Sequence, residues 1–176
     1  AIAFGDGIDW NAEGRRAARE SAADADAGEM LANIHAAIRG EGEKWAAGLR
    51  VVDCGCNIGR FYPQFAAVGF EYCGLDQAAE ALTIARARFP EARFIDTFLW
   101  DARWPSYFGP FDVALCNAVL QHNTHAEKHR ILPRIAESLR QGGLFAFQES
   151  TVIDQTPTQL RHEEWIAIAQ TYGFTL

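Results

Sequence analysis

Short apolar runs alternate with helical stretches along most of this chain, and this alternation is the feature that most restricts its fold. The apolar runs cover residues 49–55, 70–76, 92–99, 111–117 and 143–150. Continuous apolar runs of this length are typical of strands buried on both faces of a parallel sheet. Apolar residues at helical spacing lie between the runs, most clearly over 60–68, 78–89 and 124–140. The pattern predicts an α/β fold, a doubly wound and mostly parallel sheet in three α/β/α layers with right-handed crossovers.

The segment that precedes the first strand reads as helix. Residues 11–40 are rich in Ala, Arg and Glu, and Gly28 is expected to break this helix in two. The helix has an apolar stripe that must pack against another part of the protein. This stripe consists of Met30, Leu31, Ile34 and Ile38. We expect residues 1–45 to form an N-terminal helical extension or lid. Residues 46–176 then form the ligand-binding domain, because no linker-like stretch divides them.

Composition excludes several classes of protein. The chain has 176 residues, of which 49% are hydrophobic, so one globular domain can bury a full core. No apolar run approaches the roughly 18 to 20 residues that span a bilayer, and no secretion signal is visible at the start. The expected location is therefore cytoplasmic. A net charge of −7 disfavours nucleic acid as a partner.

The carboxyl ends of the first two strands carry the strongest indication of a ligand. Ligands of open α/β sheets bind beyond the carboxyl ends of the strands, near the point where strand order reverses. The segment DCGCNIG, residues 53–59, runs from a strand through a glycine bend into a helix. Asp76 ends the second strand 21 residues after Gly55, which is the position expected of a carboxylate that accepts both hydroxyls of a ribose. These features predict an adenosine-containing ligand.

Two common nucleotide-binding motifs are missing from the sequence. Neither the G-x-G-x-x-G fingerprint of dinucleotide-binding enzymes nor a P-loop lysine occurs anywhere in the chain. A nicotinamide-dependent oxidoreductase would need the first of them. The ligand is therefore expected to contain ribose and adenine but no pyrophosphate.

From residue 49 to residue 176 the chain resembles the class I S-adenosylmethionine-dependent methyltransferases, which have a Rossmann-like fold. VVDCGCNIGR resembles the first motif of that family, D-x-G-x-G-x-G, and GLDQ resembles the second. FLWDARWP and FDVALCNAVLQH resemble the third and fourth motifs. SLRQGGLFAFQES resembles the Gly-Gly turn and the strand that follow. Five motifs in the right order make the resemblance specific.

This resemblance implies S-adenosylmethionine as cofactor and assigns roles to individual residues. Asp76 would bind the ribose, Asp101 the adenine amino group, and the strand end at Asn117 the methionine portion. The full set of implied cofactor-binding residues is Asp53, Gly55, Cys56, Asn57, Gly59, Asp76, Gln77, Trp100, Asp101, Asn117 and Ala118.

The sequence departs from the family pattern at two places. Asn57 stands where the family usually has its middle glycine, and Asn is the residue that best replaces Gly in a left-handed backbone conformation. The chain also stops after RHEEWIAIAQTYGFTL, which resembles the last helix and the first residues of a sixth strand. We therefore expect the C-terminal strands to be truncated.

Cys54, Cys56, Cys73 and Cys116 all fall at or near strand ends, so a metal site has to be weighed. The C-x-C spacing is poor for zinc compared with C-x₂-C, and the other two cysteines are isolated. Small apolar side chains that pack behind the cofactor loop are the preferred interpretation. No metal is expected.

The sequence indicates the catalytic residues less clearly than the residues that bind the cofactor. Methyl transfer depends mainly on alignment of the acceptor with the methyl group, and a general base is needed only where the acceptor must lose a proton. The candidate catalytic residues at the carboxyl edge are His122 and Glu149. Each has a structural alternative: His122 as a helix-start residue that is paired to the backbone and anchors the turn, and Glu149 as a solvated residue or a partner of the N-terminal helix. Both alternatives remain open at this stage.

The fourth motif bears on the acceptor. It reads CNAVL and lacks the N/D-P-P-Y/F that the resemblance associates with methylation of base amino groups. Its VLQH ending resembles the branch that methylates O, N or C atoms of small molecules. The alternatives are a non-catalytic S-adenosylmethionine-binding protein and a methyltransferase that acts on protein or RNA. Trp10, Trp100 and Trp104 are either walls of the site or core residues.

Overall fold

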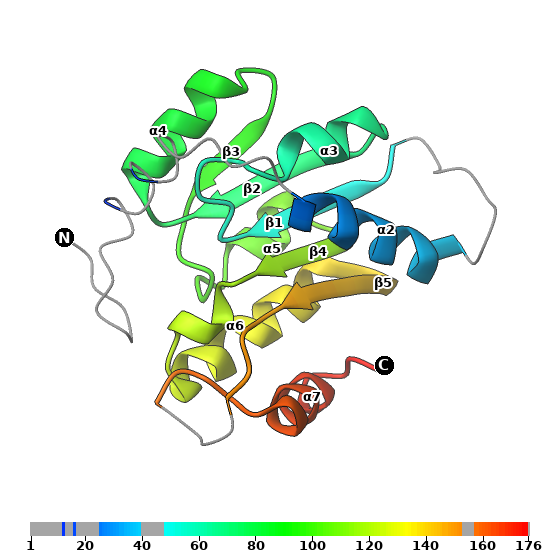
Figure 1. Cartoon of the computed structure of the whole chain (residues 1–176), viewed down its shortest axis with the longest axis vertical. Helices are drawn as coiled ribbons and strands as arrows, with labels where there is room; N and C mark the ends of the chain where they lie inside the picture. Colours follow the sequence, from blue (N-terminus) through cyan, green and yellow to red (C-terminus); the bar gives the residue numbers. More distant parts are fainter. Residues whose placement is uncertain (1–11, 13–15, 17–24, 40–47, 153–156, 176) are drawn as a thin grey trace.

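The computed structural model contains a five-stranded parallel sheet between two layers of helices (Figure 1). The residues that the structure describes are 12, 16, 25–39, 48–152 and 157–175. The strands are β1 (Arg50–Cys54), β2 (Glu71–Asp76), β3 (Arg93–Asp96), β4 (Phe111–Asn117) and β5 (Leu139–Gln148).

The order of the strands indicates where the sheet is expected to bind a ligand. The sheet runs β3-β2-β1-β4-β5, and every neighbouring pair is parallel. The chain passes from β1 outward to β2 and β3, and then returns to the other side of β1 with β4. Strand order therefore reverses between β1 and β4, which is where open α/β sheets bind their ligands.

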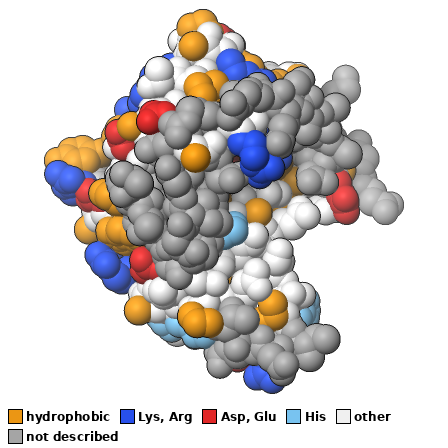
Figure 2. All heavy atoms as spheres, turned by 60° about the vertical axis from the view of Figure 1, so that its left-hand side comes forward, with side chains coloured by type: hydrophobic (Ala, Val, Ile, Leu, Met, Phe, Trp, Pro, Cys, Tyr) orange, Lys and Arg blue, Asp and Glu red, His pale blue; other side chains and the backbone are white. Residues whose placement is uncertain are grey.

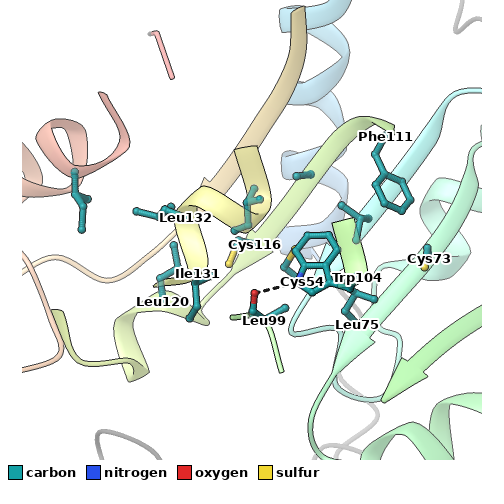
Figure 3. Close-up of a cluster of buried hydrophobic side chains, with 14 of the residues drawn as sticks. Cys54, Cys73, Leu75, Leu99, Trp104, Phe111, Cys116, Leu120, Ile131 and Leu132 are labelled. Atoms are coloured by element: carbon teal, nitrogen blue, oxygen red, sulfur yellow. Dashed lines mark hydrogen bonds between the residues drawn. The ribbon is translucent and has the colours of Figure 1, made fainter. Parts of the chain in front are cut away.

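Helices cover both faces of the sheet. They are α2 (Ala25–Arg39), α3 (Tyr62–Ala67), α4 (Ala79–Arg88), α5 (Trp104–Phe108), the 3₁₀ helix η1 (Leu120–His122), α6 (His125–Ser138) and α7 (His162–Thr171). One buried cluster joins β1 and β2 to α2, α3 and α4, and it contains Met30, Phe65 and Leu82. The other, drawn in Figure 3, packs Trp104 and Ile131 against the opposite face. The three-layer α/β fold expected from the sequence is confirmed.

Helix α2 is continuous through Gly28, so the expected break at this residue is wrong. Met30 and Ile34 are buried against the sheet, and that packing holds the helix across the glycine. Trp10, the side chain of Ile38 and most of the first 24 residues lie outside the described residues. The lid role of residues 1–45 and the boundary near residue 46 stay predictions.

Two other boundaries differ from the sequence-based expectation. Strand β5 begins at Leu139, directly after α6, instead of at Gly143. The pairing of β4 with β5 shifts register between Phe111 and Val113, and Arg140 forms an ion pair with Asp112 at 2.8 Å there. The Gly-Gly segment is thus absorbed into an irregular strand. After α7, the described residues up to 175 contain no strand, so the expected start of a sixth strand is not present.

Gly28→Ala should stabilise the fold by about 0.5–1 kcal/mol, because Ala loses less backbone entropy in a helix interior. A Cβ at Gly28 meets no atom within 4 Å, so the new methyl group causes no clash. Gly69→Ala is the matched control. Its surroundings are equally open but its φ is +84°, so Ala should destabilise there. Urea denaturation of both variants tests this, and a destabilised Gly28→Ala protein would contradict it.

Candidate functional site

The bend that joins β1 to α3 lies directly on the end of β2. The N–H groups of Gly55 and Cys56 both donate to the carbonyl oxygen of Leu75, at 2.8 and 3.0 Å. Gly55 has φ +81°, and a Cβ built there would lie 2.4 Å from a methyl group of Val119. Only glycine fits this position, so the backbone of the bend is held close to the ends of β2 and β4.

Asn57 occupies the left-handed region with φ +50°, which confirms that Asn can replace the family's middle glycine here. Its N–H donates to Oδ2 of Asp76 at 2.8 Å. Gly59, two residues further on, also has positive φ, at +75°. The bend therefore keeps the expected course and places Asn57 beside the carboxylate that ends β2.

Asp76 is held from two sides. Its Oδ1 accepts the N–H of Ala78 at 2.9 Å, while its Oδ2 accepts that of Asn57. Burial raises the pKa of Asp76 above its ordinary value, and the backbone N–H groups of Ala78, Asn57 and Gln77 oppose that rise. Each carboxylate oxygen accepts two hydrogen bonds, so both can still receive a hydroxyl. The arrangement fixes the carboxylate for a vicinal diol.

Asp53 and Cys56 lie behind the bend. The Asp53 side chain is 2% exposed and accepts a hydrogen bond from the Tyr72 hydroxyl at 2.5 Å. Burial raises its pKa to about 7, although the Tyr72 hydrogen bond lowers it. The Cys56 thiol is also buried, and a Cβ at Gly74 would lie 2.7 Å from its sulfur. The side chains of these two sequence-predicted residues support the loop from the core side.

The pH dependence of stability should report on Asp53. An unfolded Asp has a pKa near 4, so between about pH 4 and 7 the folded protein holds a proton that the unfolded chain releases. The stability that this proton contributes is present below about pH 4 and is lost as the pH rises through 7. Asp53→Asn removes this ionisation. The difference in free energy of unfolding between variant and wild type should therefore shift in favour of the variant by on the order of 2–4 kcal/mol from pH 4 to pH 8. Urea unfolding at both pH values measures this, and parallel pH profiles would contradict it.

Strand β4 ends in a second strained position. Ala118 has φ +52°, uncommon for a residue with a side chain, and its N–H donates to the carbonyl of Gln148 at 2.8 Å. Beside it, Nδ2 of Asn117 is buried without a hydrogen-bond partner, and so is Oδ1 of Asn57 in the bend. Nearly all buried polar atoms in native proteins have partners. One donor and one acceptor left unpaired at this edge indicate a polar ligand.

Glu149 organises the loop that follows β4. Its carboxylate accepts the N–H groups of Val119, Leu120 and Gln121 at 3.2, 2.9 and 3.0 Å. Burial raises the pKa of Glu149 to about 7, against the lowering effect of these N–H groups. Both carboxylate oxygens are used within the protein. Glu149 therefore holds the loop 119–121, a contact that the sequence did not indicate, and its catalytic role stays a prediction.

His122 ends η1, and its imidazole is half-buried at the same edge. Its Nε2 lies 3.2 Å from Nε2 of Gln121. The other end of the Gln121 amide, Oε1, accepts the N–H of Ser150 at 2.6 Å. The loop after β4 and the end of β5 are thus joined through one side-chain amide that also touches the ring of His122.

The segment after β3 carries Asp101 with a partner of its own. The Asp101 carboxylate accepts from Nε and Nη2 of Arg103, at 3.0 and 2.5 Å, and from the Arg103 N–H at 2.9 Å. The hydrogen bonds from the Arg103 side chain, followed by the backbone one, lower the pKa of Asp101 to about 2. Trp100 stacks on Phe98 with ring centroids 4.9 Å apart. Asp101 stays ionised at any ordinary pH.

Trp104 belongs to the core. It is 1% exposed, and its indole N–H donates to the carbonyl of Leu99 at 3.0 Å (Figure 3). All four cysteines are free and buried, as the packing interpretation predicts. Cys54, Cys73 and Cys116 lie in the same cluster as Trp104, and Cys56 lies in the other. The described residues contain no group of three or more potential metal ligands.

Three polar residues of this region were missed from the sequence. Tyr72 and Gln121 have been described above. The third, Lys128, is fully buried, and its Nζ donates to the carbonyls of Asn123 and Thr158. Burial lowers the pKa of Lys128 to about 8. In the sequence, Lys128 stands out only as a polar residue within an apolar helical pattern, and this pattern does not show which groups accept its hydrogen bonds.

The face that carries the carboxyl edge is turned toward the reader in Figure 2. Where described side chains are visible on this face, Lys and Arg stand apart from one another. Within the described part of the chain, no helix has the length and apolar character needed to cross a membrane.

Comparison with known proteins agrees with this geometry. The family model of the methyltransferase domain matches residues 52–145. A trans-aconitate 2-methyltransferase of Methylobacterium nodulans is 36% identical over 110 residues, which are 58% of this chain and 39% of that relative. The chain spans less than half the length of the curated relatives it matches.

Solved structures of low sequence identity share the fold. A TehB-like S-adenosylmethionine-dependent methyltransferase of Corynebacterium glutamicum has a TM-score of 0.70 at 16% identity, covering 93% of this chain and 80% of that one. A Haemonchus contortus phosphoethanolamine N-methyltransferase, solved with S-adenosylhomocysteine, has a TM-score of 0.65 at 20% identity, covering 84% and 37%. This chain belongs to the methyltransferase domain family, within the class I S-adenosylmethionine-dependent methyltransferases. The cofactor of that family is S-adenosylmethionine.

Proposed function

We propose that this chain binds S-adenosylmethionine across the carboxyl ends of β1, β2 and β4 and transfers its methyl group to a small-molecule acceptor. The observation that carries the proposal is the pair of unpartnered buried atoms, Oδ1 of Asn57 and Nδ2 of Asn117, on either side of the strand-order reversal. Asn57 supplies an acceptor beside the Asp76 carboxylate, and Asn117 supplies a donor at the end of β4, on the other side of β1. A zwitterionic nucleoside fits this set of groups.

Each part of the cofactor has a candidate partner in this arrangement. Asp76 would accept the two ribose hydroxyls, and the neighbouring Gln77 would line the same part of the site. Asn117 would donate to the carboxylate of the methionine portion next to Ala118. Asp101 would accept the adenine amino group after partial release from Arg103, and Trp100 would flank the ring.

The Gly55–Gly59 bend is proposed to lie along the cofactor with its backbone. Gly55 and Gly59 allow the close approach, and Asp53 and Cys56 hold the bend from behind. Bound S-adenosylmethionine supplies an electrophilic methyl group on a positively charged sulfur. The residues of the chain then have to orient the acceptor and exclude water, since alignment contributes most to such a transfer.

A carboxylate is the acceptor that best agrees with the relatives. Three of them are named trans-aconitate 2-methyltransferases, and one is 36% identical over the matched region. A carboxylate is already deprotonated near pH 7, so no general base is required. In this account His122 orients the acceptor, and Glu149 holds the loop that carries His122.

The direct test is a methylation assay with isotopically labelled S-adenosylmethionine. The acceptor panel contains trans-aconitate, other di- and tricarboxylates, and hydroxyl and amine compounds of similar size. We expect a methyl ester of a carboxylic acid as the product, detected by mass spectrometry, and much less product with Asp76→Ala when the cofactor concentration is limiting. Tight cofactor binding without product from any acceptor in the panel would favour the non-catalytic alternative.

A further inference from the structure

Val119 follows the strained Ala118, and its main chain is held from both sides. Its N–H donates to Oε1 of Glu149 at 3.2 Å. Its carbonyl oxygen accepts hydrogen bonds from Nδ2 of Asn123 at 2.8 Å and from the N–H of His122 at 3.1 Å. The main chain at Val119 therefore cannot shift without loss of hydrogen bonds to three other residues.

The isopropyl group of Val119 lies directly on Gly55. A Cβ built at Gly55 would lie 2.4 Å from one methyl carbon of Val119 and 2.9 Å from the other, and real Cβ atoms do not approach other atoms so closely. The space that a side chain at position 55 would occupy is thus filled by Val119. Glycine is needed at this position for the contact as well as for the left-handed turn at φ +81°.

The Gly55–Gly59 bend is held between the two strands that flank β1. The N–H groups of Gly55 and Cys56 donate to Leu75, and the N–H of Asn57 donates to Asp76, so these hydrogen bonds tie the bend to β2. The Val119 side chain contacts the same bend from the opposite side, where β4 ends. The two sets of contacts together fix the distance between the bend and the end of β4.

We propose that Val119 is a positioning residue that holds the Gly55–Gly59 bend in the shape that receives S-adenosylmethionine. Without the two methyl groups the bend gains room to move toward β4, and binding then has to restrict this motion, which weakens affinity. Val119 needs no contact with the cofactor for this role. The inference rests on the proposed function and extends it, because it makes cofactor affinity depend on the loop that Glu149 holds.

The bend can be examined without any cofactor, by hydrogen exchange. The amides of Gly55 and Cys56 exchange with solvent when their hydrogen bonds to Leu75 open. Val119→Ala removes two partly buried methyl groups from the bend, so both amides should exchange about three- to tenfold faster than in wild type. NMR of the protein without ligand measures these rates residue by residue.

Val68→Ala is the matched control for a general loss of stability. Val68 is also partly buried, but it caps the C-terminal end of α3, and the substitution removes the same two methyl groups. Val68→Ala should lower the free energy of unfolding by an amount comparable to that of Val119→Ala. The exchange of the Gly55 and Cys56 amides should stay within about twofold of wild type in this control.

Calorimetry with S-adenosylhomocysteine provides the second measurement. The affinity of Val119→Ala should fall by about three- to tenfold, because the bend has to be ordered on binding. Val119→Thr keeps the branched shape of the side chain, so its affinity should return to within about twofold of wild type. Val68→Ala should bind S-adenosylhomocysteine as tightly as wild type.

Three results would overturn the inference. The first is wild-type exchange of the Gly55 and Cys56 amides in Val119→Ala, and the second is wild-type affinity in that variant. The third is an equal loss of affinity in Val68→Ala, since loss of stability alone would then explain both variants. Failure of the proposed function would be seen separately, as absence of S-adenosylhomocysteine binding to the wild-type protein.

Discussion

Asp76→Ala should weaken binding of S-adenosylhomocysteine by about 10- to 150-fold, which corresponds to about 1.5–3 kcal/mol for hydrogen bonds to a charged group. In the proposed complex this carboxylate accepts both ribose hydroxyls. It also accepts the N–H groups of Asn57 and Ala78, so its removal releases the bend as well. Isothermal titration calorimetry on both proteins measures the loss.

Asp96→Ala is the control for this experiment. Asp96 is paired with Asp76 in the register of β2 and β3, ends the neighbouring strand and is exposed. The Asp96→Ala substitution removes the same charge from the same edge of the sheet. The affinity of this variant for S-adenosylhomocysteine should lie within about twofold of wild type. Equal affinities for wild type and Asp76→Ala would exclude the ribose assignment.

Glu149→Ala should lower the free energy of unfolding by about 2–4 kcal/mol, because three partly buried N–H groups lose a charged acceptor at once. The turn Leu120–His122 depends on these bonds, so turnover should fall together with stability. Urea denaturation and the methylation assay, carried out on the same preparation, measure the two effects.

Gln148→Ala serves as the matched control, since its side chain is exposed and only its carbonyl holds Ala118. Gln148→Ala should change neither the free energy of unfolding nor turnover by more than experimental error. A Glu149→Ala protein with wild-type stability and reduced turnover would instead make Glu149 a catalytic residue. That was the other reading of this residue from the sequence.

The sheet and its binding edge could be predicted because both depend on local patterns. Continuous apolar runs separated by helical spacing specify a parallel sheet, and the distance from Gly55 to Asp76 follows from one βαβ unit. The left-handed Asn57 could be predicted because it stands where the resembled family has a glycine and because Asn tolerates this conformation. These features need no knowledge of which side chains meet.

The contacts within the site could not be predicted in the same way. The hydrogen bond from the Tyr72 hydroxyl to Asp53 depends on the register of two strands, and the one from the Ser150 N–H to the Gln121 amide oxygen joins residues 29 positions apart. Gly28 was expected to break a helix because its local propensity is unfavourable. Burial of Met30 and Ile34 outweighs that propensity, and no pattern within the helix reveals the surface it packs on.

A crystal structure of the complex with S-adenosylhomocysteine tests the central claim most directly. The account predicts the ribose hydroxyls within hydrogen-bond distance of both Asp76 oxygens. It also predicts the amino-acid portion beside Asn57 and Asn117, and the adenine amino group at Asp101. Cofactor bound at the opposite, amino-terminal edge of the sheet, or Asp101 in solvent with Asp96 at the adenine, would contradict it.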